Sequence, residues 1–222
     1  MAIIRKTCVA IALVVAISIA GSGGFALGGE PAAAPSDPMV QMKTLADQII
    51  AAARGPECQS GQQACREKLR SLVEGHWDIS EMARMALGVH WKQLDDNERQ
   101  RFAKLFGDLT EAIYLSRAKL SKAEGLSKDV KVDFVREILD GDSYSQVNTY
   151  ITLQGHDKPI GVNYRLKRDG DVWKAYDVIV DGISIVSNYR NQFSRVINNK
   201  GYPELVRELQ EKVRQVNSSE GT

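Results

Sequence analysis

The spacing of apolar residues changes twice along the chain. Between residues 39 and 113 they recur every three or four positions, as with Met42, Ala46 and Ile49, which is typical of amphipathic helices. After Gly125 the period becomes two, and from residue 186 to residue 216 helical spacing returns. This order predicts an α+β architecture: helices come first, a sheet follows, and the last helices return to cover the sheet.

Four alternating runs predict the strands of an antiparallel meander. They begin at Val130, Val147, Ile160 and Val172. The segments between them have turn chemistry, as in Asp140-Gly141-Asp142 and Asp169-Gly170. We therefore expect a four-stranded antiparallel sheet whose neighbouring strands are joined by short turns.

Local signals predict several helix ends. Asp78 with Glu81 three positions later, and Asp95 with Glu98, are typical of capped helix starts. Gly201 predicts the end of the next-to-last helix, and the last helix should start close to Pro203.

The N-terminus is typical of a secretory signal peptide. Arg5 and Lys6 precede an apolar or small run, and Gly24 and Ala26 stand where signal peptidase prefers small residues. The run is about 14 residues, or about 21 Å as a helix, which is short for a membrane anchor across a hydrocarbon core of about 30 Å. We expect residues 1–26 to be removed, leaving an exported, periplasmic protein.

The mature chain is predicted to hold one domain. Residues 27–38 are rich in Gly, Ala and Pro and predict a flexible leader. Residues 39–216 form the domain, and residues 217–222 a polar tail. The 29 basic and 28 acidic residues nearly balance, so charge gives no reason to expect nucleic-acid binding.

Cysteine usage predicts one disulfide. Cys8 lies within the signal peptide, which leaves Cys58 and Cys65 in an oxidising compartment with six residues between them. We expect these two to form a local bridge between two helices. The alternative, a redox-active pair, would favour the closer C-x-x-C spacing.

The sequence contains no recognisable catalytic or cofactor motif. The nucleophile elbow, the phosphate-binding loop and the dinucleotide fingerprint are all missing, and the three histidines lack metal-ligand spacing. Asp177 and Asp181 would lie about 13 Å apart on one strand face, which is wide for shared acid–base work. We therefore expect no enzyme activity, no catalytic residue, no metal and no cofactor.

A set of basic residues lies on the predicted helices before the sheet. The set comprises Arg99, Arg101, Lys104, Arg117, Lys119 and Lys122. A solvated helix face is the interpretation that this pattern favours. A docking patch for a partner or for lipid headgroups is the alternative.

Several segments, in the same order along the chain, resemble the MlaC family of ABC-transporter auxiliary proteins, also called toluene-tolerance proteins. They are 82–91, 101–106, 163–166, 173–174, 176–184 and 188–193. The resemblance spans residues 39–216, except that the loop around Cys58 and Cys65 looks like a local insertion. A hopanoid-associated branch shares the pattern, so a hopanoid-related cargo remains the alternative to phospholipid.

The resemblance implies a periplasmic phospholipid carrier. In the family, acyl tails lie in an apolar cavity between a curved sheet, a cup like those of NTF2 or cystatin, and several helices. The carrier moves lipid between an outer-membrane lipoprotein–porin complex and an inner-membrane ABC transporter with an MCE-domain subunit, which bears on outer-membrane lipid asymmetry. The bound lipid would be cargo rather than a cofactor.

Apolar residues on the predicted helices and strands are candidates for tail contact. On helices these are Met82, Met85, Phe102, Phe106, Leu109, Ile113, Tyr189 and Phe193. On strands they are Val147, Ile151, Val162, Tyr164, Leu166, Tyr176, Val178 and Val180. In the last strand we favour the face of Tyr176, Val178 and Val180 over that of Trp173, Ala175 and Ile179. Any of these side chains could instead fill an ordinary core.

Arg190 is the candidate for contact with a lipid headgroup or a partner, with a salt bridge to Asp177 or Asp181 as the alternative. Two other classes of protein stay open. One is an exported enzyme that uses Asp177 or His90 as acid or base, and the other is an interaction protein with a filled core and no lipid.

Overall fold

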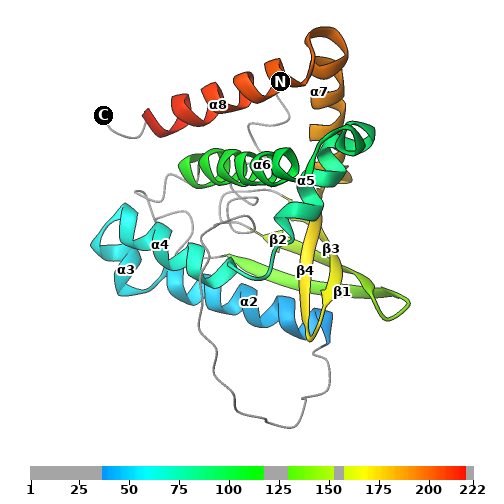
Figure 1. Cartoon of the computed structure of the whole chain (residues 1–222). Helices are drawn as coiled ribbons and strands as arrows, with labels where there is room; N and C mark the ends of the chain where they lie inside the picture. Colours follow the sequence, from blue (N-terminus) through cyan, green and yellow to red (C-terminus); the bar gives the residue numbers. More distant parts are fainter. Residues whose placement is uncertain (1–36, 118–129, 153–157, 219–222) are drawn as a thin grey trace, which may run out of the picture.

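The computed structural model describes residues 37–117, 130–152 and 158–218 (Figure 1). The predictions of a signal peptide and of most of the leader fall on residues 1–36, outside this part of the chain. No helix among the described residues is long and apolar enough to cross a membrane.

The order of elements confirms the predicted α+β class. The helices before the sheet are α2 (Pro38–Ala53), α3 (Pro56–Ser60), α4 (Gln62–Val73), α5 (Ile79–Leu87) and α6 (Asp96–Arg117), with a 3₁₀ helix, η1 (Gly88–Gln93), after α5. The strands are β1 (Lys131–Asp140), β2 (Tyr144–Thr152), β3 (Ile160–Asp169), β4 (Val172–Val180) and β5 (Ile183–Ser184). The chain continues with α7 (Ile185–Lys200) and α8 (Tyr202–Ser218). Thus α8 extends two residues into the predicted polar tail.

The sheet is an antiparallel meander in the order β1-β2-β3-β4-β5. It has one strand more than expected, because the chain reverses at Asp181 and Gly182, both with positive φ, and β5 pairs with the end of β4. Two residues are too few to show a period of two, so the sequence pattern missed this strand.

A β-bulge in β4 decides which residues share the inner face of the sheet. Tyr164 lies opposite Val178, but two positions on in β3, Leu166 lies opposite Ala175 rather than Tyr176. The extra residue shifts the alternation, so Ala175 takes the inner face and Tyr176 turns outwards, with its ring 6.0 Å from that of Tyr144. The prediction that Tyr176 lies on the same face as Val178 and Val180 is therefore wrong.

The predicted helix ends are confirmed. Asp78 accepts a hydrogen bond from the backbone N–H of Glu81. Asp95 and Glu98 cap each other reciprocally, at 2.7 and 2.9 Å. Gly201, with φ of 86°, follows α7, and Pro203 is the second residue of α8.

The helices form two groups (Figure 1). The first comprises α2, α3 and α4, and α2 lies against β1 and β2. In the second, α5 packs against α6 and α7, and α8 packs against α6 and α7. Phe102 and Phe106 of α6 interlock with Phe193 of α7 at ring distances of 5.9 and 6.2 Å, which ties this second group together.

Candidate functional site

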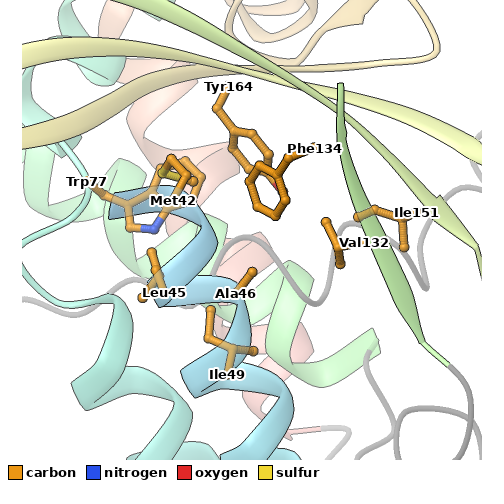
Figure 2. A pocket seen from close by; sticks show the side chains of 9 residues that line it. All are labelled: Met42, Leu45, Ala46, Ile49, Trp77, Val132, Phe134, Ile151 and Tyr164. Carbon is orange, nitrogen blue, oxygen red and sulfur yellow. The ribbon is translucent and has the colours of Figure 1, made fainter. Parts of the chain in front are cut away.

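An apolar pocket lies between α2 and the inner face of the sheet. It is lined by Met42, Leu45, Ala46, Ile49, Trp77, Val132, Phe134, Ile151 and Tyr164. Four of these residues come from α2 and four from β1, β2 and β3, and Figure 2 shows the two sets facing each other. Spacing of three and four on α2, and of two on β1, brings the lining residues onto one side of each element.

The pocket is narrow in this structure. Its volume is about 20 Å³, enough for about one water molecule. A hydrocarbon chain would therefore enter only if α2 and the neighbouring strands moved apart. Among the described strands β1 lies at the edge of the sheet and pairs with β2 alone, so fewer backbone hydrogen bonds oppose a movement there than at a central strand.

Among the nine side chains that line the pocket, Tyr164 is the one with a hydroxyl group. Burial raises the pKa of this phenol, and a hydrogen bond with the Thr149 side chain works against that rise. Thr149 itself donates to the carbonyl oxygen of Val162 at 2.7 Å. Tyr164 is therefore a neutral, hydrogen-bonded side chain and has no charge to offer a ligand.

Hydrogen bonds attach the N-terminal end of α2 to two strands of the sheet, β1 and β4. At β1, the backbone N–H of Met39 donates to the Glu137 carboxylate at 2.7 Å. At β4, the Gln41 side chain accepts from the N–H of Trp173 at 2.9 Å and donates to its carbonyl oxygen at 2.6 Å. Gln41 thereby pairs with the edge of β4 as a backbone amide of a further strand would.

His76 completes this attachment. Its Nδ1 lies 3.1 Å from Nε2 of Gln41, and burial lowers the pKa of the imidazole. A neutral ring can accept the remaining amide hydrogen of Gln41, whereas an imidazolium could not. The backbone around His76 is itself held by β4, because Ala175 exchanges hydrogen bonds of 2.8 and 2.9 Å with His76 and Asp78.

The other end of α2 leads into a disulfide-bonded turn. The structure joins Cys58 of α3 to Cys65 of α4, the pair that the sequence predicts. Cys65 is buried, and Leu69 and Val73 of α4 lie with it in the core. The bridge therefore stabilises the helical hairpin that supports α2 and, through α2, one wall of the pocket.

Two of the sixteen predicted contact residues, Ile151 and Tyr164, line this pocket. Five others lie on the same face of the sheet but in the continuous core: Val147, Val162, Leu166, Val178 and Val180. Tyr176 lies on the outer face. Lipid contact by the core residues stays a prediction.

The predicted helix residues gather in the second group of helices instead of at α2. Met82, Phe102, Phe106, Leu109 and Phe193 are buried, and Met85 and Tyr189 are half-buried and pack against the same core. The Ile113 side chain lies outside the described part of the chain. Aromatic rings fill this region, with centroids 5.3 to 6.4 Å apart. Such packing agrees with the alternative interpretation, in which these side chains fill an ordinary core.

Sequence reasoning missed most of the pocket. The spacing of Met42, Ala46 and Ile49 did predict an amphipathic helix, and Val132 with Phe134 predicted a strand face. Nothing in these patterns says that the two faces meet. No sequence pattern marked Trp77 as a pocket residue, because it lies in the short segment before α5, outside any helix or strand.

Arg190 has a structural role. Its Nε donates to the carbonyl oxygen of Met85 at 2.7 Å, and its side chain packs over Gly88, where an added Cβ would come within 3.3 Å of it. The alternative of a salt bridge to Asp177 or Asp181 is wrong: the salt bridges among the described residues do not include Arg190, and Asp177 pairs with Arg165 instead. Contact of Arg190 with a headgroup stays a prediction.

The buried carboxylate of Asp177 organises the backbone. It accepts hydrogen bonds from the Ser184 hydroxyl at 2.7 Å and from the N–H of Val186 at 3.1 Å, and Arg165 lies 3.4 Å away. These contacts fix the start of α7 against β4. Among the described residues, no group of three His, Cys, Asp or Glu side chains is placed to hold a metal ion.

The chain resembles known proteins over most of its length. The family model described as MlaC protein matches residues 43–211. The intermembrane phospholipid transport system binding protein MlaC of Haemophilus influenzae is 20% identical over 193 residues, which cover 83% of this chain and 86% of that protein.

A solved structure shares the fold. It is that of a phospholipid-binding protein from Ralstonia solanacearum in complex with a phospholipid. The two structures superpose with a TM-score of 0.68 and 23% sequence identity, over 82% of this chain and 99% of that one.

Proposed function

This chain belongs to the MlaC family, and from that premise we propose that it is a periplasmic phospholipid carrier that holds acyl chains between α2 and the inner face of the sheet. The carrier exchanges lipid with an outer-membrane lipoprotein–porin complex and with an inner-membrane ABC transporter that has an MCE-domain subunit. One observation carries the proposal. Apolar or aromatic side chains from a helix and three strands face each other across the pocket.

The known relatives support the same function. The Haemophilus relative is named as the binding protein of a phospholipid transport system, and the Ralstonia protein of the same fold was solved with a phospholipid bound. Export through a signal peptide would bring this chain to the compartment between the two membranes.

Energetics explain why such a carrier needs no catalytic group. A two-tailed lipid has about 30 methylenes, and exposing each to water costs about 0.8 kcal/mol. An apolar protein interior offsets most of this cost, as a bilayer does, so transfer between them is close to isoenergetic. The direction of transport would then come from the partners.

The narrowness of the pocket bears on the cargo. A flexible acyl chain can enter progressively as α2 separates from the sheet, and the thioether of Met42 adapts to variable shapes. A rigid polycyclic hopanoid would need a wide opening at once. The pocket therefore favours phospholipid over the hopanoid alternative.

Filling the pocket tests the proposal. Ala46 lines it, whereas Ala51 lies exposed on the same helix. We expect mildly purified wild-type protein to yield about one phospholipid per chain on organic extraction and mass spectrometry. Ala46→Phe should lower this yield at least fivefold, and the control Ala51→Phe should leave it unchanged. A wild-type protein free of lipid, or unchanged lipid in Ala46→Phe, would contradict the proposal.

A further inference from the structure

Trp77 places a buried hydrogen-bond donor in the wall of the apolar pocket. Its side chain is 8% exposed, and its indole N–H has no hydrogen-bond partner among the described residues. Figure 2 shows the ring beside the side chains of α2, with its nitrogen on the side of Leu45. A buried N–H without an acceptor costs free energy, so it calls for a specific explanation, and a ligand that supplies the acceptor is one.

The backbone fixes the position of this indole. Trp77 forms an isolated parallel bridge with Ala175 of β4. The hydrogen bonds that Ala175 exchanges with His76 and Asp78, at 2.8 and 2.9 Å, hold the segment on both sides of Trp77. Gln41 of α2 is bonded to the same strand, so the donor lies where α2 is attached to the sheet. The N–H is therefore held in place before a ligand arrives, which favours a directional contact.

The hydroxyl group of the pocket has already used its proton. Thr149 donates its own proton to the carbonyl oxygen of Val162 at 2.7 Å, so in the hydrogen bond with Thr149 the phenol of Tyr164 is the donor. Among the nine lining side chains, Trp77 is thus the one with an unused donor. Elsewhere in the described part of the chain, the buried polar side-chain atoms without a partner belong to residues that do not line the pocket: Arg70, His90 and Ser145.

The surroundings of the donor select a neutral acceptor. None of the nine lining side chains is charged, so a phosphate or an amine would lose its hydration there without a compensating charge. In a membrane lipid, the ester carbonyl oxygen that joins an acyl chain to glycerol is a neutral acceptor at the end of that chain. With this carbonyl at Trp77, the chain could follow the lining residues of α2 from Met42 to Ile49, about 10 Å at 1.5 Å per residue.

We propose that the indole N–H of Trp77 donates a hydrogen bond to an ester carbonyl oxygen of the cargo, and that Trp77 thereby makes the pocket selective for lipids with ester-linked acyl chains. This inference rests on the proposed function, because it names the part of the lipid that the pocket recognises. An ether-linked lipid with the same chains and headgroup buries the same hydrocarbon but leaves the N–H without the carbonyl. A site built to hydrogen-bond a group discriminates against analogues that lack it.

Competition between ester and ether lipids tests this selectivity. The purified protein is incubated with vesicles that contain equal amounts of diester and diether phosphatidylcholine of the same chain length, and is then re-isolated and extracted for mass spectrometry. We expect the wild type to hold at least about five times more diester than diether lipid. Trp77→Phe keeps an aromatic ring without the N–H, and its ratio should fall to within about twofold of one. Trp91→Phe removes an indole outside the pocket, so this control should keep the wild-type ratio.

Nuclear magnetic resonance of the indole groups gives a second measurement, which needs no variant. The chain has three tryptophans, so its ¹H–¹⁵N spectrum holds three indole signals that can be assigned. The Trp77 signal should move downfield when diester lipid replaces diether lipid, because a hydrogen bond deshields the donated proton. The Trp91 signal should stay in place. This measurement decides the question even if Trp77→Phe does not fold.

The outcomes separate the two proposals. A wild-type ratio near one, or uptake of neither lipid, overturns the selectivity and leaves the carrier function standing if the purified protein yields lipid of its own. An unchanged ratio in Trp77→Phe, or an unmoved Trp77 signal, shows that another group recognises the ester and also overturns the role of Trp77. A purified wild-type protein that holds no lipid at all overturns the carrier function itself.

Discussion

On β2 and β3, Val147 and Val162 point inwards and are fully buried, whereas the adjacent Asn148 and Asn163 point outwards and stay partly exposed. The same strands thus build two unlike surfaces. The inner one closes on an apolar space of about 20 Å³, and the outer one carries a polar hollow of about 370 Å³.

This difference follows from what covers each face. Apolar side chains gain by leaving water, so α2 and the core close over the inner face. Polar side chains gain little from burial without partners, so the outer face stays open. One sheet thereby combines an apolar inner face, which is closed to water, with a hydrated polar outer face.

The largest difference should appear when the same charge is placed first on the inner face and then on the outer face. Val162→Glu would bury a carboxylate among apolar side chains, and we expect it to lower the free energy of unfolding by about 3–5 kcal/mol or to prevent folding. Asn163→Glu, one residue away, should change it by less than about 0.5 kcal/mol. Urea unfolding followed by circular dichroism measures both, and similar losses in the two variants would remove the distinction between the faces.

Breaking the disulfide should disturb the inner face alone. The Cys58→Ser/Cys65→Ser variant should lose about 2–3 kcal/mol of stability, because a short loop is no longer closed in the unfolded chain. It should also release lipid faster to acceptor vesicles, since α4 supports α2. An unchanged rate of lipid release would contradict the role of this helical hairpin in supporting the pocket wall.

Removing the attachment of α2 should have a smaller effect on stability. Gln41→Ala deletes the side-chain hydrogen bonds to Trp173 and His76, and we expect a loss of about 1–3 kcal/mol together with faster lipid release. Gln48→Ala, at an exposed position of the same helix, is the control. The idea that Gln41 holds the pocket wall fails if both variants release lipid at the same rate.

The smallest effect is a dependence on pH. Burial lowers the pKa of His76 in the folded protein below its ordinary 6.5, so between these two values the unfolded chain binds more protons than the folded one. Stability should therefore fall as the pH drops below 6.5, and the interaction with Gln41 should weaken. Unfolding at pH 7.5, 6.5 and 5.5 would test this. In His76→Gln this part of the pH dependence should vanish, and an unchanged profile would contradict the role of His76.

Local patterns were sufficient for much of the fold. The alternation from residue 130 to residue 180 predicted the four long strands, and the pairs Asp78/Glu81 and Asp95/Glu98 predicted two helix starts. These features depend on residues close in sequence, whose backbone and side chains interact directly.

The sequence by itself thus determined the class of fold, the family and the face that each helix or regular strand would bury. Tertiary structure decided that Tyr176 turns outwards, because a bulge depends on how β4 registers with β3. It also decided that α2, rather than α5 or α6, faces the pocket, and that Arg99 and Lys104 of α6 pair with Asp96 and Asp108. An amphipathic pattern states that a face seeks burial, but which surface meets it, and how closely, depends on contacts between segments far apart in the chain.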